Sequence, residues 1–103
     1  MITVIVNFKL PDRMTREEII SKFEQTVQKW QDNQDLIRKN YLIDHDRRIA
    51  GGVYLWKEKI HADIWLGAEF RKMVKENYGE EPTFQYFETP IVIDNVASDI
   101  TKD

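Results

Sequence analysis

Gly51-Gly52-Val53-Tyr54-Leu55-Trp56 places two glycines ahead of an alternating aromatic strand. Residues 36–44 form a second predicted strand just before it, and the polar residues 45–48 between the two have the composition of a hairpin turn. The glycines remove side chains where the later strand begins. Such a pair indicates a β-bulge, which we favour, or room for a ligand beside Tyr54 and Trp56.

The first third of the chain predicts a strand followed by a helix. Residues 2–9 are rich in β-branched side chains and largely apolar on both faces, which indicates burial on both sides. Thr15 and Glu18 match a capping box at the start of a helix, and Asn33 is a plausible C-cap. Apolar residues then recur at three- and four-residue steps, and they predict an inner face of Ile19, Ile20, Phe23, Val27 and Trp30.

The second half predicts another broken helix and a further strand. Residues 58–66 are helix-prone, Gly67 interrupts them, and a helix resumes over 68–78 before ending at Gly79. Residues 83–88 alternate as a fourth long strand. After Pro90 we expect a short apolar strand at 91–93 and then a polar tail from 94 to 103. The predicted inner face of the resumed helix is Phe70, Met73, Val74 and Tyr78.

The order of elements predicts an α+β fold of the ferredoxin-like, split βαβ type. Its antiparallel sheet would carry helices on one face only. Since the other face is predicted to be apolar, we expect a two-fold homodimer with the sheets packed face to face, which is a dimeric α/β-barrel. We expect residues 1–103 to form one domain, with a C-terminal extension at about 90–103.

Composition removes several classes of function. The chain has no cysteine, and its two histidines are too few for a three-histidine metal site, so we expect no metal centre. A net charge of −3, with acids and bases intermixed, argues against a nucleic-acid partner. No apolar stretch has the length of a membrane span, and no basic leader precedes the first strand. We expect a soluble, cytoplasmic protein without a membrane partner.

Two groups of residues resemble a known family. The segment 38–56, with its Gly51-Gly52-Val53-Tyr54-Leu55-Trp56 run, and the segment 84–95, with Glu88-Thr89-Pro90-Ile91-Val92-Ile93-Asp94-Asn95, are similar to the YdhR-type monooxygenases. The similarity extends over nearly the whole chain, although the turn at 45–48 departs from the acidic, glycine-containing turn of that family. The resemblance implies a dimeric α/β-barrel, a pocket between sheet and helices, and oxygenation without a cofactor.

Oxygenation without metal or flavin needs a substrate that donates electrons itself, typically an acidic phenol or enol. The protein must supply an apolar slot, a group that takes the proton and a donor for the anion. An aromatic ligand would stack on aromatic walls. For each aromatic residue alone, core packing is the more common explanation. The predicted substrate-binding residues are Tyr54, Trp56, Phe70 and Tyr86.

Three residues are candidates for catalysis. His61 has an unperturbed pKa suited to a base near neutrality, and Trp65 follows four residues later on the same helix face. Asn7 lies mid-strand among apolar neighbours, where a buried amide needs hydrogen bonds. A solvated histidine and a backbone-bound amide are the simpler interpretations. Arg38 and Lys39 could attract an anion, but alternating charges on a strand usually face water.

Three classes of function remain open from the sequence. They are a cofactor-free monooxygenase, a non-catalytic dimeric protein that binds small aromatic molecules, and an interaction module. Asn7 and Trp65 are also similar to residues of the haem-degrading branch of the same superfamily. That branch uses a helical histidine as its iron ligand, and no histidine follows His61 here, so haem degradation is less favoured.

Overall fold

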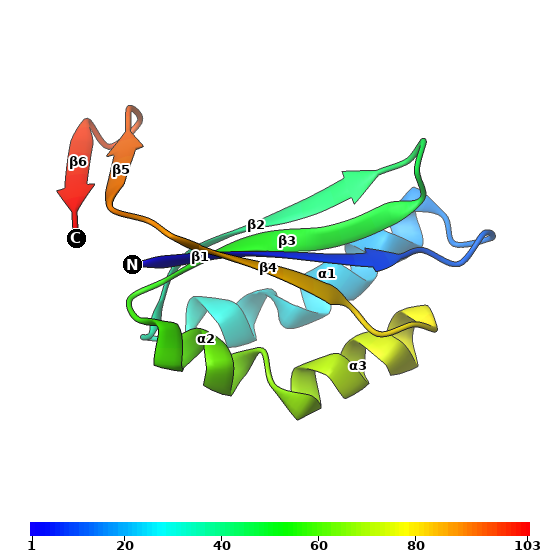
Figure 1. Cartoon of the computed structure of the whole chain (residues 1–103). Helices are drawn as coiled ribbons and strands as arrows, with labels where there is room; N and C mark the ends of the chain where they lie inside the picture. The colour runs from blue at the N-terminus through cyan, green and yellow to red at the C-terminus, as the bar shows by residue number, and fades with distance from the viewer.

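Three helices cover one face of a four-stranded antiparallel sheet in the computed structural model, which describes residues 1–103 (Figure 1). The strands follow the order β2-β3-β1-β4. This α+β arrangement is compatible with the predicted ferredoxin-like fold. The elements are β1 Ile2–Lys9, α1 Arg16–Gln31, β2 Leu36–Asp44, β3 Ile49–Trp56, α2 Lys59–Trp65, α3 Ala68–Tyr78, β4 Thr83–Glu88, β5 Ile91–Asp94 and β6 Asp99–Lys102.

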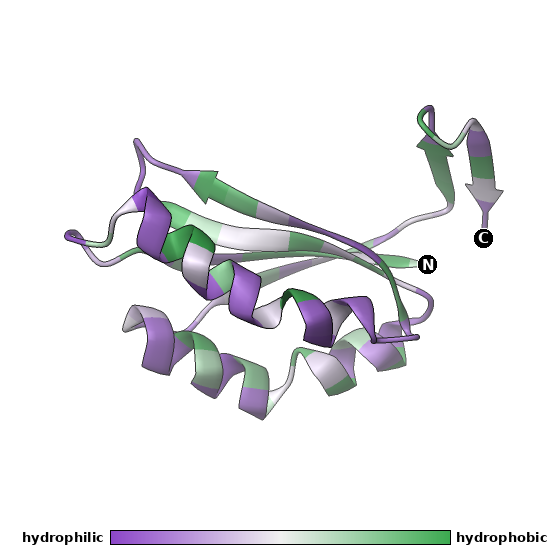
Figure 2. Cartoon of the chain, turned by 180° about the vertical axis from the view of Figure 1, so that it is seen from behind, coloured by the Kyte–Doolittle hydropathy of each residue, from purple (hydrophilic) through white to green (hydrophobic).

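The core lies between the sheet and the helices. In the central pair of strands, Val4 is opposite Tyr54 and Val6 is opposite Gly52, so these residues share the face that the helices cover. Hydrophilic and hydrophobic bands alternate along the helices in Figure 2, as expected for helices that bury one stripe. The largest fully buried side chains are Trp56, Ile19, Leu66, Val4, Val6 and Val74.

The expected β-bulge at the two glycines is wrong. Pairing of β1 with β3 is continuous through Gly51 and Gly52, and the one register shift of β2 and β3 lies between Leu36 and Arg38. The glycines instead permit close packing. A Cβ on Gly51 would lie 1.8 Å from the carbonyl oxygen of Val6, so no side chain fits between these strands.

Helix α1 begins as predicted but ends differently. The Thr15 hydroxyl accepts a hydrogen bond from the Glu18 backbone N–H at 3.2 Å, which confirms the cap. The C-cap is Asp32, and the Asn33 side chain accepts from the Asp35 backbone N–H at 3.0 Å. Val27, expected on the inner face, is 44% exposed because it borders a surface hollow beside β2.

The second helical region breaks and stops at the predicted glycines. Gly67 separates α2 from α3 as the N-cap of α3, and Gly79 ends α3 with a φ of 97°, in the left-handed region that favours glycine. Along α3 the side chains of Phe70, Val74 and Tyr78 are buried and Met73 is half-buried. The predicted inner face of this helix is therefore confirmed.

The polar tail expected from 94 to 103 contains a strand, β6, that the sequence did not predict. β5 and β6 pair as a separate hairpin that projects from the main sheet (Figure 1). Asp94 begins its turn by accepting backbone N–H bonds from Val96 and Ala97, and Ser98 ends the turn with positive φ. The β2–β3 turn has the same design, with Asp44 accepting from the Arg47 backbone N–H and Arg48 at positive φ.

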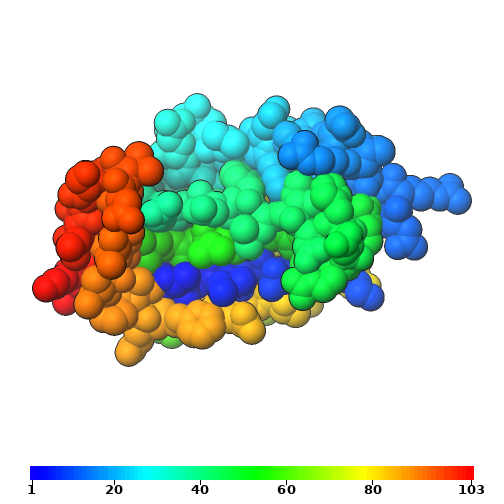
Figure 3. Space-filling model, turned by 90° about the horizontal axis from the view of Figure 1, so that it is seen from above, coloured from blue at the N-terminus to red at the C-terminus, as the bar shows by residue number.

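The second face of the sheet carries no helix. Figure 3 looks down on this open face, where the strands form a floor between the β5–β6 hairpin at one end and the β2–β3 turn at the other. Ile5 and Val53 are half-buried there, while Leu42 and Phe87 are 37% and 51% exposed. None of the three helices has both the length and the apolar character of a membrane span.

We predict that Gly51→Ala severely destabilises the protein, because the new methyl group would overlap the Val6 carbonyl. The free energy of unfolding in urea should fall by roughly 3 kcal/mol or more. Gly67→Ala is the matched control, since its Cβ would meet no atom closer than 3.3 Å. It should cost less than ~1 kcal/mol. Equal losses in the two variants would contradict close strand packing at Gly51.

Candidate functional site

An aromatic pocket of about 210 Å³ opens between the sheet and helices α1 and α3. Of its 15 lining residues 9 are hydrophobic, so a ligand here would contact mainly apolar surface. Its walls come from α1, α3 and the three strands β1, β2 and β3. The aromatic residues that line it are Phe8, Phe23, Trp30, Tyr41, Tyr54, Phe70 and Tyr78.

Lys39 of β2 brings a charged group into this pocket. Its Nζ lies 3.9 Å from the ring centroid of Tyr41, 4.4 Å from that of Tyr54 and 4.7 Å from that of Trp30. Lys39 takes part in none of the protein's ion pairs or side-chain hydrogen bonds. The amine therefore meets aromatic rings on several sides and has no carboxylate partner.

Gly52 makes this position of Lys39 possible. It shares the helix-covered face with Tyr54 and with Lys39, which is paired opposite Tyr54. A Cβ on Gly52 would lie 3.1 Å from Cε1 of Tyr54 and 3.2 Å from Cε of Lys39. The missing side chain thus leaves room for the lysine stem to cross the strand. The sequence indicated room for a ligand beside Tyr54. In the structure the side chain of Lys39 takes up this room.

Burial, followed by the positive charge of Lys29, lowers the pKa of Lys39 from 10.5 to about 7. The ring faces act in the opposite direction, because their quadrupoles attract whatever positive charge the amine retains. Near neutral pH the amine is therefore divided between an ammonium that donates hydrogen bonds and a free base that accepts a proton. An exposed lysine holds almost no free base at that pH.

Tyrosine hydroxyls supply the other polar groups of the pocket. The Tyr41 hydroxyl lies 2.7 Å from Oγ1 of Thr26, which donates to the Phe23 carbonyl. Tyr54 and Tyr78 are 2% and 7% exposed, and neither hydroxyl has a partner among the side-chain hydrogen bonds. Burial raises the pKa of Tyr78 to about 12 and that of Tyr54 well above its ordinary value. Both hydroxyls therefore remain protonated donors at neutral pH.

The pocket's edge is polar. Lys22 donates from Nζ to Oδ1 of Asn77 at 3.3 Å, which joins α1 to α3, and its Nζ lies 6.0 Å from the ring centroid of Tyr78. Gln25 also lines the pocket. A ligand would thus meet amide and ammonium groups at the edge and aromatic faces inside. No three histidine or acidic side chains gather into a metal-binding cluster.

The structure brings two of the four predicted substrate-binding residues into the pocket. Tyr54 and Phe70 line it, and their rings pack edge to face at 6.1 Å. Trp56 is fully buried behind Tyr54, with the two rings stacked at 6.0 Å, and does not line the pocket. Tyr86 of β4 is 39% exposed and lies beside Lys59, outside it.

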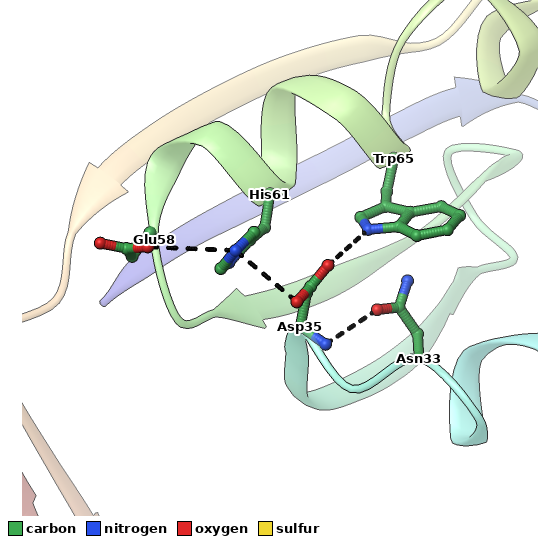
Figure 4. Close-up of polar contacts among 5 residues, drawn as sticks. All are labelled: Asn33, Asp35, Glu58, His61 and Trp65. Atoms are coloured by element: carbon green, nitrogen blue, oxygen red, sulfur yellow. Dashed lines mark hydrogen bonds and ion pairs between the residues drawn. The ribbon is translucent and has the colours of Figure 1, made fainter.

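His61 and Trp65 form a separate cluster with Asp35 (Figure 4). The Trp65 indole N–H donates to one Asp35 carboxylate oxygen at 3.1 Å, and Nε2 of His61 lies 3.6 Å from the other. Glu58 is 4.0 Å from the same His61 nitrogen. These contacts hold α2 against the loop that precedes β2. Neither His61 nor Trp65 lines the aromatic pocket.

Asn7 lies on the open face of the sheet. It alternates along β1 with Val6 and Phe8, whose side chains are buried beneath the helices, so its own side chain points the other way. Asn7 is half-buried and is not among the residues that line the pocket. The expected contact between Asn7 and a ligand in this pocket is therefore absent, and its side chain lies where a partner sheet would pack.

Sequence reasoning assigned Lys39 to a solvated face, and the structure places it in the pocket. Its neighbours Arg38 and Asn40 are exposed, as that assignment expected. The one usable signal was the alternation of Lys39 with Tyr41 and Ile43, which places the lysine on the same strand face as two large apolar side chains. Pairing with β3 then brings this face beneath α1.

No protein-family model matches this chain, and no curated protein matches it. The case for a functional site therefore rests on the pocket itself. Its distinguishing features are a lysine without a carboxylate partner, the hydroxyls of two largely buried tyrosines that form no side-chain hydrogen bond, and aromatic walls. Together they suit a small planar molecule that carries an acidic oxygen.

We predict that Lys39 makes stability depend on pH. Its pKa is about 7 in the folded state and near 10.5 in the unfolded chain, so between these values the unfolded state binds more protons. The free energy of unfolding should therefore rise with pH across this window, by at most ~1.4 kcal/mol per pH unit.

The measurement is urea unfolding of the wild type and of Lys39→Met at several pH values between 6 and 9. The wild type should gain stability relative to the variant as the pH rises. The variant keeps the apolar stem, which limits loss of packing. Parallel profiles for the two proteins would contradict a lowered pKa at Lys39.

Proposed function

We propose that the aromatic pocket binds a small phenol or enol and that the protein is a cofactor-independent monooxygenase acting on it. The observation that carries this proposal is Lys39, whose amine lies among three aromatic rings without a carboxylate partner. An acidic oxygen of the substrate would supply the missing partner. The surrounding rings suit a planar aromatic body.

Recognition would combine one charged contact with aromatic packing. The phenolic or enolic oxygen approaches Nζ of Lys39, and the ring of the substrate packs against Phe70 and Phe8. Tyr54 and Tyr78 supply donors that stay protonated at neutral pH. A hydrogen bond to a charged group contributes about 1.5–3 kcal/mol, so the contact with Lys39 would increase the affinity roughly tenfold or more.

The chemistry would begin with proton transfer to the free amine of Lys39. This produces a substrate anion beside an ammonium ion, and the apolar pocket strengthens their attraction. The anion then reduces molecular oxygen. For a substrate such as anthrone, the reactive CH₂ becomes C=O, one oxygen atom enters the product and the other leaves as water with the two hydrogens. The substrate supplies all four electrons, so no further reductant is needed.

The same residues also support a second candidate function, the binding of a small aromatic molecule without turnover. The hydrogen-bond donors and aromatic walls are sufficient to recognise such a molecule. Turnover also needs molecular oxygen and a substrate that reduces it, and both come from outside the protein. Haem degradation has less support. His61, the one histidine on a helix, contacts Asp35 and Glu58 outside the pocket.

We also propose that the protein is a member of the YdhR-type family and forms its dimeric α/β-barrel. The open face of the sheet supports this assembly, because Leu42 and Phe87 are apolar side chains exposed on it. The β5–β6 hairpin at one end of that face exposes further apolar side chains. These are Ile91, Ile93, Val96 and Ile100.

We predict oxygen uptake when the purified protein is incubated with anthrone and a panel of phenols, with product mass followed in parallel. Lys39→Met should lower both binding and turnover by roughly tenfold or more, since the anion loses its charged partner. Lys72→Met, at an exposed lysine of α3, is the matched control and should behave as wild type. Saturable binding without oxygen uptake would favour the non-catalytic function, and no binding would exclude both.

A separate prediction concerns the open face. Phe87→Asp should weaken self-association by roughly tenfold or more, because a charge would be placed within an apolar interface. Ile64→Asp is the control, since Ile64 is 62% exposed on α2 at the helical side of the protein. Light scattering at micromolar concentration measures both. A monomeric wild type would contradict the proposed barrel.

A further inference from the structure

The aromatic pocket contains an amine with the surroundings of a nucleophile. Nζ of Lys39 lies 3.9–4.7 Å from three ring centroids and forms no ion pair. No carboxylate of the protein therefore keeps this amine in its charged form. We infer that Lys39 is a covalent binding site, at which small aromatic aldehydes that enter the pocket form a reversible imine.

The reaction joins the amine to the aldehyde carbon. The lone pair of Nζ attacks the carbonyl carbon and a C–N bond forms, while the carbonyl oxygen takes up a proton. That oxygen then leaves as water, which carries away both protons of the amine, and a C=N bond remains. No electron leaves or enters, so neither an oxidant nor a reductant is required. Water reverses the step.

The pocket favours both the reactants and the product. The aldehyde's ring replaces water against Phe70, Phe8 and Val74, which concentrates the carbonyl beside the amine. If the imine nitrogen is protonated, the rings of Tyr41, Tyr54 and Trp30 remain positioned around the positive charge.

The charged and titratable groups around Lys39 also favour the free amine. From α1, Lys29 opposes a second positive charge, and Lys22 lies at the pocket edge. Tyr41 on β2, Tyr54 on β3 and Tyr78 on α3 have raised pKa values and remain neutral. No carboxylate lines the pocket to stabilise the ammonium form. Lys39 therefore differs from the exposed lysines in being a free base over part of the neutral range.

This inference needs the pocket of the proposed function but none of its oxygen chemistry. Oxygen uptake with phenols and imine formation with aldehydes have different substrates and different readouts. A protein that forms the imine without consuming oxygen would refute the monooxygenase and leave the covalent site intact. A protein that consumes oxygen with phenols but forms no imine would refute the covalent site and leave the proposed monooxygenase intact.

The test uses benzaldehyde as the probe and cyanoborohydride to reduce the imine to a stable benzyl amine. The intact 103-residue chain is incubated with limiting reagent near pH 7.5, and its mass is then measured. We expect a mass increase of one benzyl group, and peptide mapping should place it at Lys39. The free-base fraction predicts labelling of Lys39 over the exposed lysines by roughly tenfold or more, after allowance for the weaker nucleophilicity of a less basic amine.

Variants separate the covalent site from general amine reactivity. Lys39→Arg keeps a positive charge but removes the nucleophile, so it should lose the rapid label, as should Lys39→Met. Lys72→Met should retain it. Circular dichroism checks that each variant is folded. If a Lys39 variant is not folded, the wild-type peptide map still compares the label at Lys39 with that at the other lysines. Label spread evenly over the lysines of the wild type would overturn the inference.

The dependence of labelling on pH gives an independent readout. The rate at Lys39 should increase with pH and level off above about 7, following the free amine of that residue. Labelling of exposed lysines should still be increasing at pH 9, because their amines are far from deprotonated there. A rate at Lys39 that parallels the exposed lysines across this range would overturn the inference even if some label reached the pocket.

Discussion

The backbone of β3 at Gly51 passes so close to the Val6 carbonyl that a Cβ placed there would be 1.8 Å from the oxygen. The four-stranded sheet depends on this contact, because β3 and β1 are its two central strands. One residue further, Gly52 leaves space on the opposite face for the stem of Lys39. Adjacent glycines thus serve two purposes, one in strand pairing and one in the pocket.

The placement of Lys39 has an energetic consequence for the whole fold. Removing an amine from water without a carboxylate partner disfavours its charged form, and the rings of Tyr41, Tyr54 and Trp30 compensate only in part. A hydrophobic side chain of similar length would avoid this cost. Residues that lower stability in a pocket are commonly those that bind or react, so the cost itself is an argument for function.

The local patterns of the sequence predicted most elements because their signals are short-range. The Thr15–Glu18 cap, the break at Gly67 and the stop at Gly79 each involve neighbours in the chain. Strand β6 was missed because all its side chains are exposed and show no burial pattern. Its turn, however, begins like the turn after Asp44, with an aspartate that accepts backbone N–H bonds, and an aspartate at this position is a turn signal in the sequence.

The site was predicted less well. Which strand face lies beneath the helices depends on long-range pairing, so Tyr54 and Phe70 line the pocket as expected, while Asn7 and Lys39 were assigned to the wrong surroundings.

The ends of the chain meet at one corner of the molecule. The N-terminal amine of Met1 pairs with the Asp103 carboxylate, and the Thr89 backbone N–H donates to the Met1 carbonyl at 2.9 Å. A short peptide joining residue 103 to residue 1 would therefore close the chain into a circle without moving either end. New termini could then be opened in an exposed turn such as 45–47. A fusion partner attached there would leave the present corner, and the hairpin beside it, unobstructed.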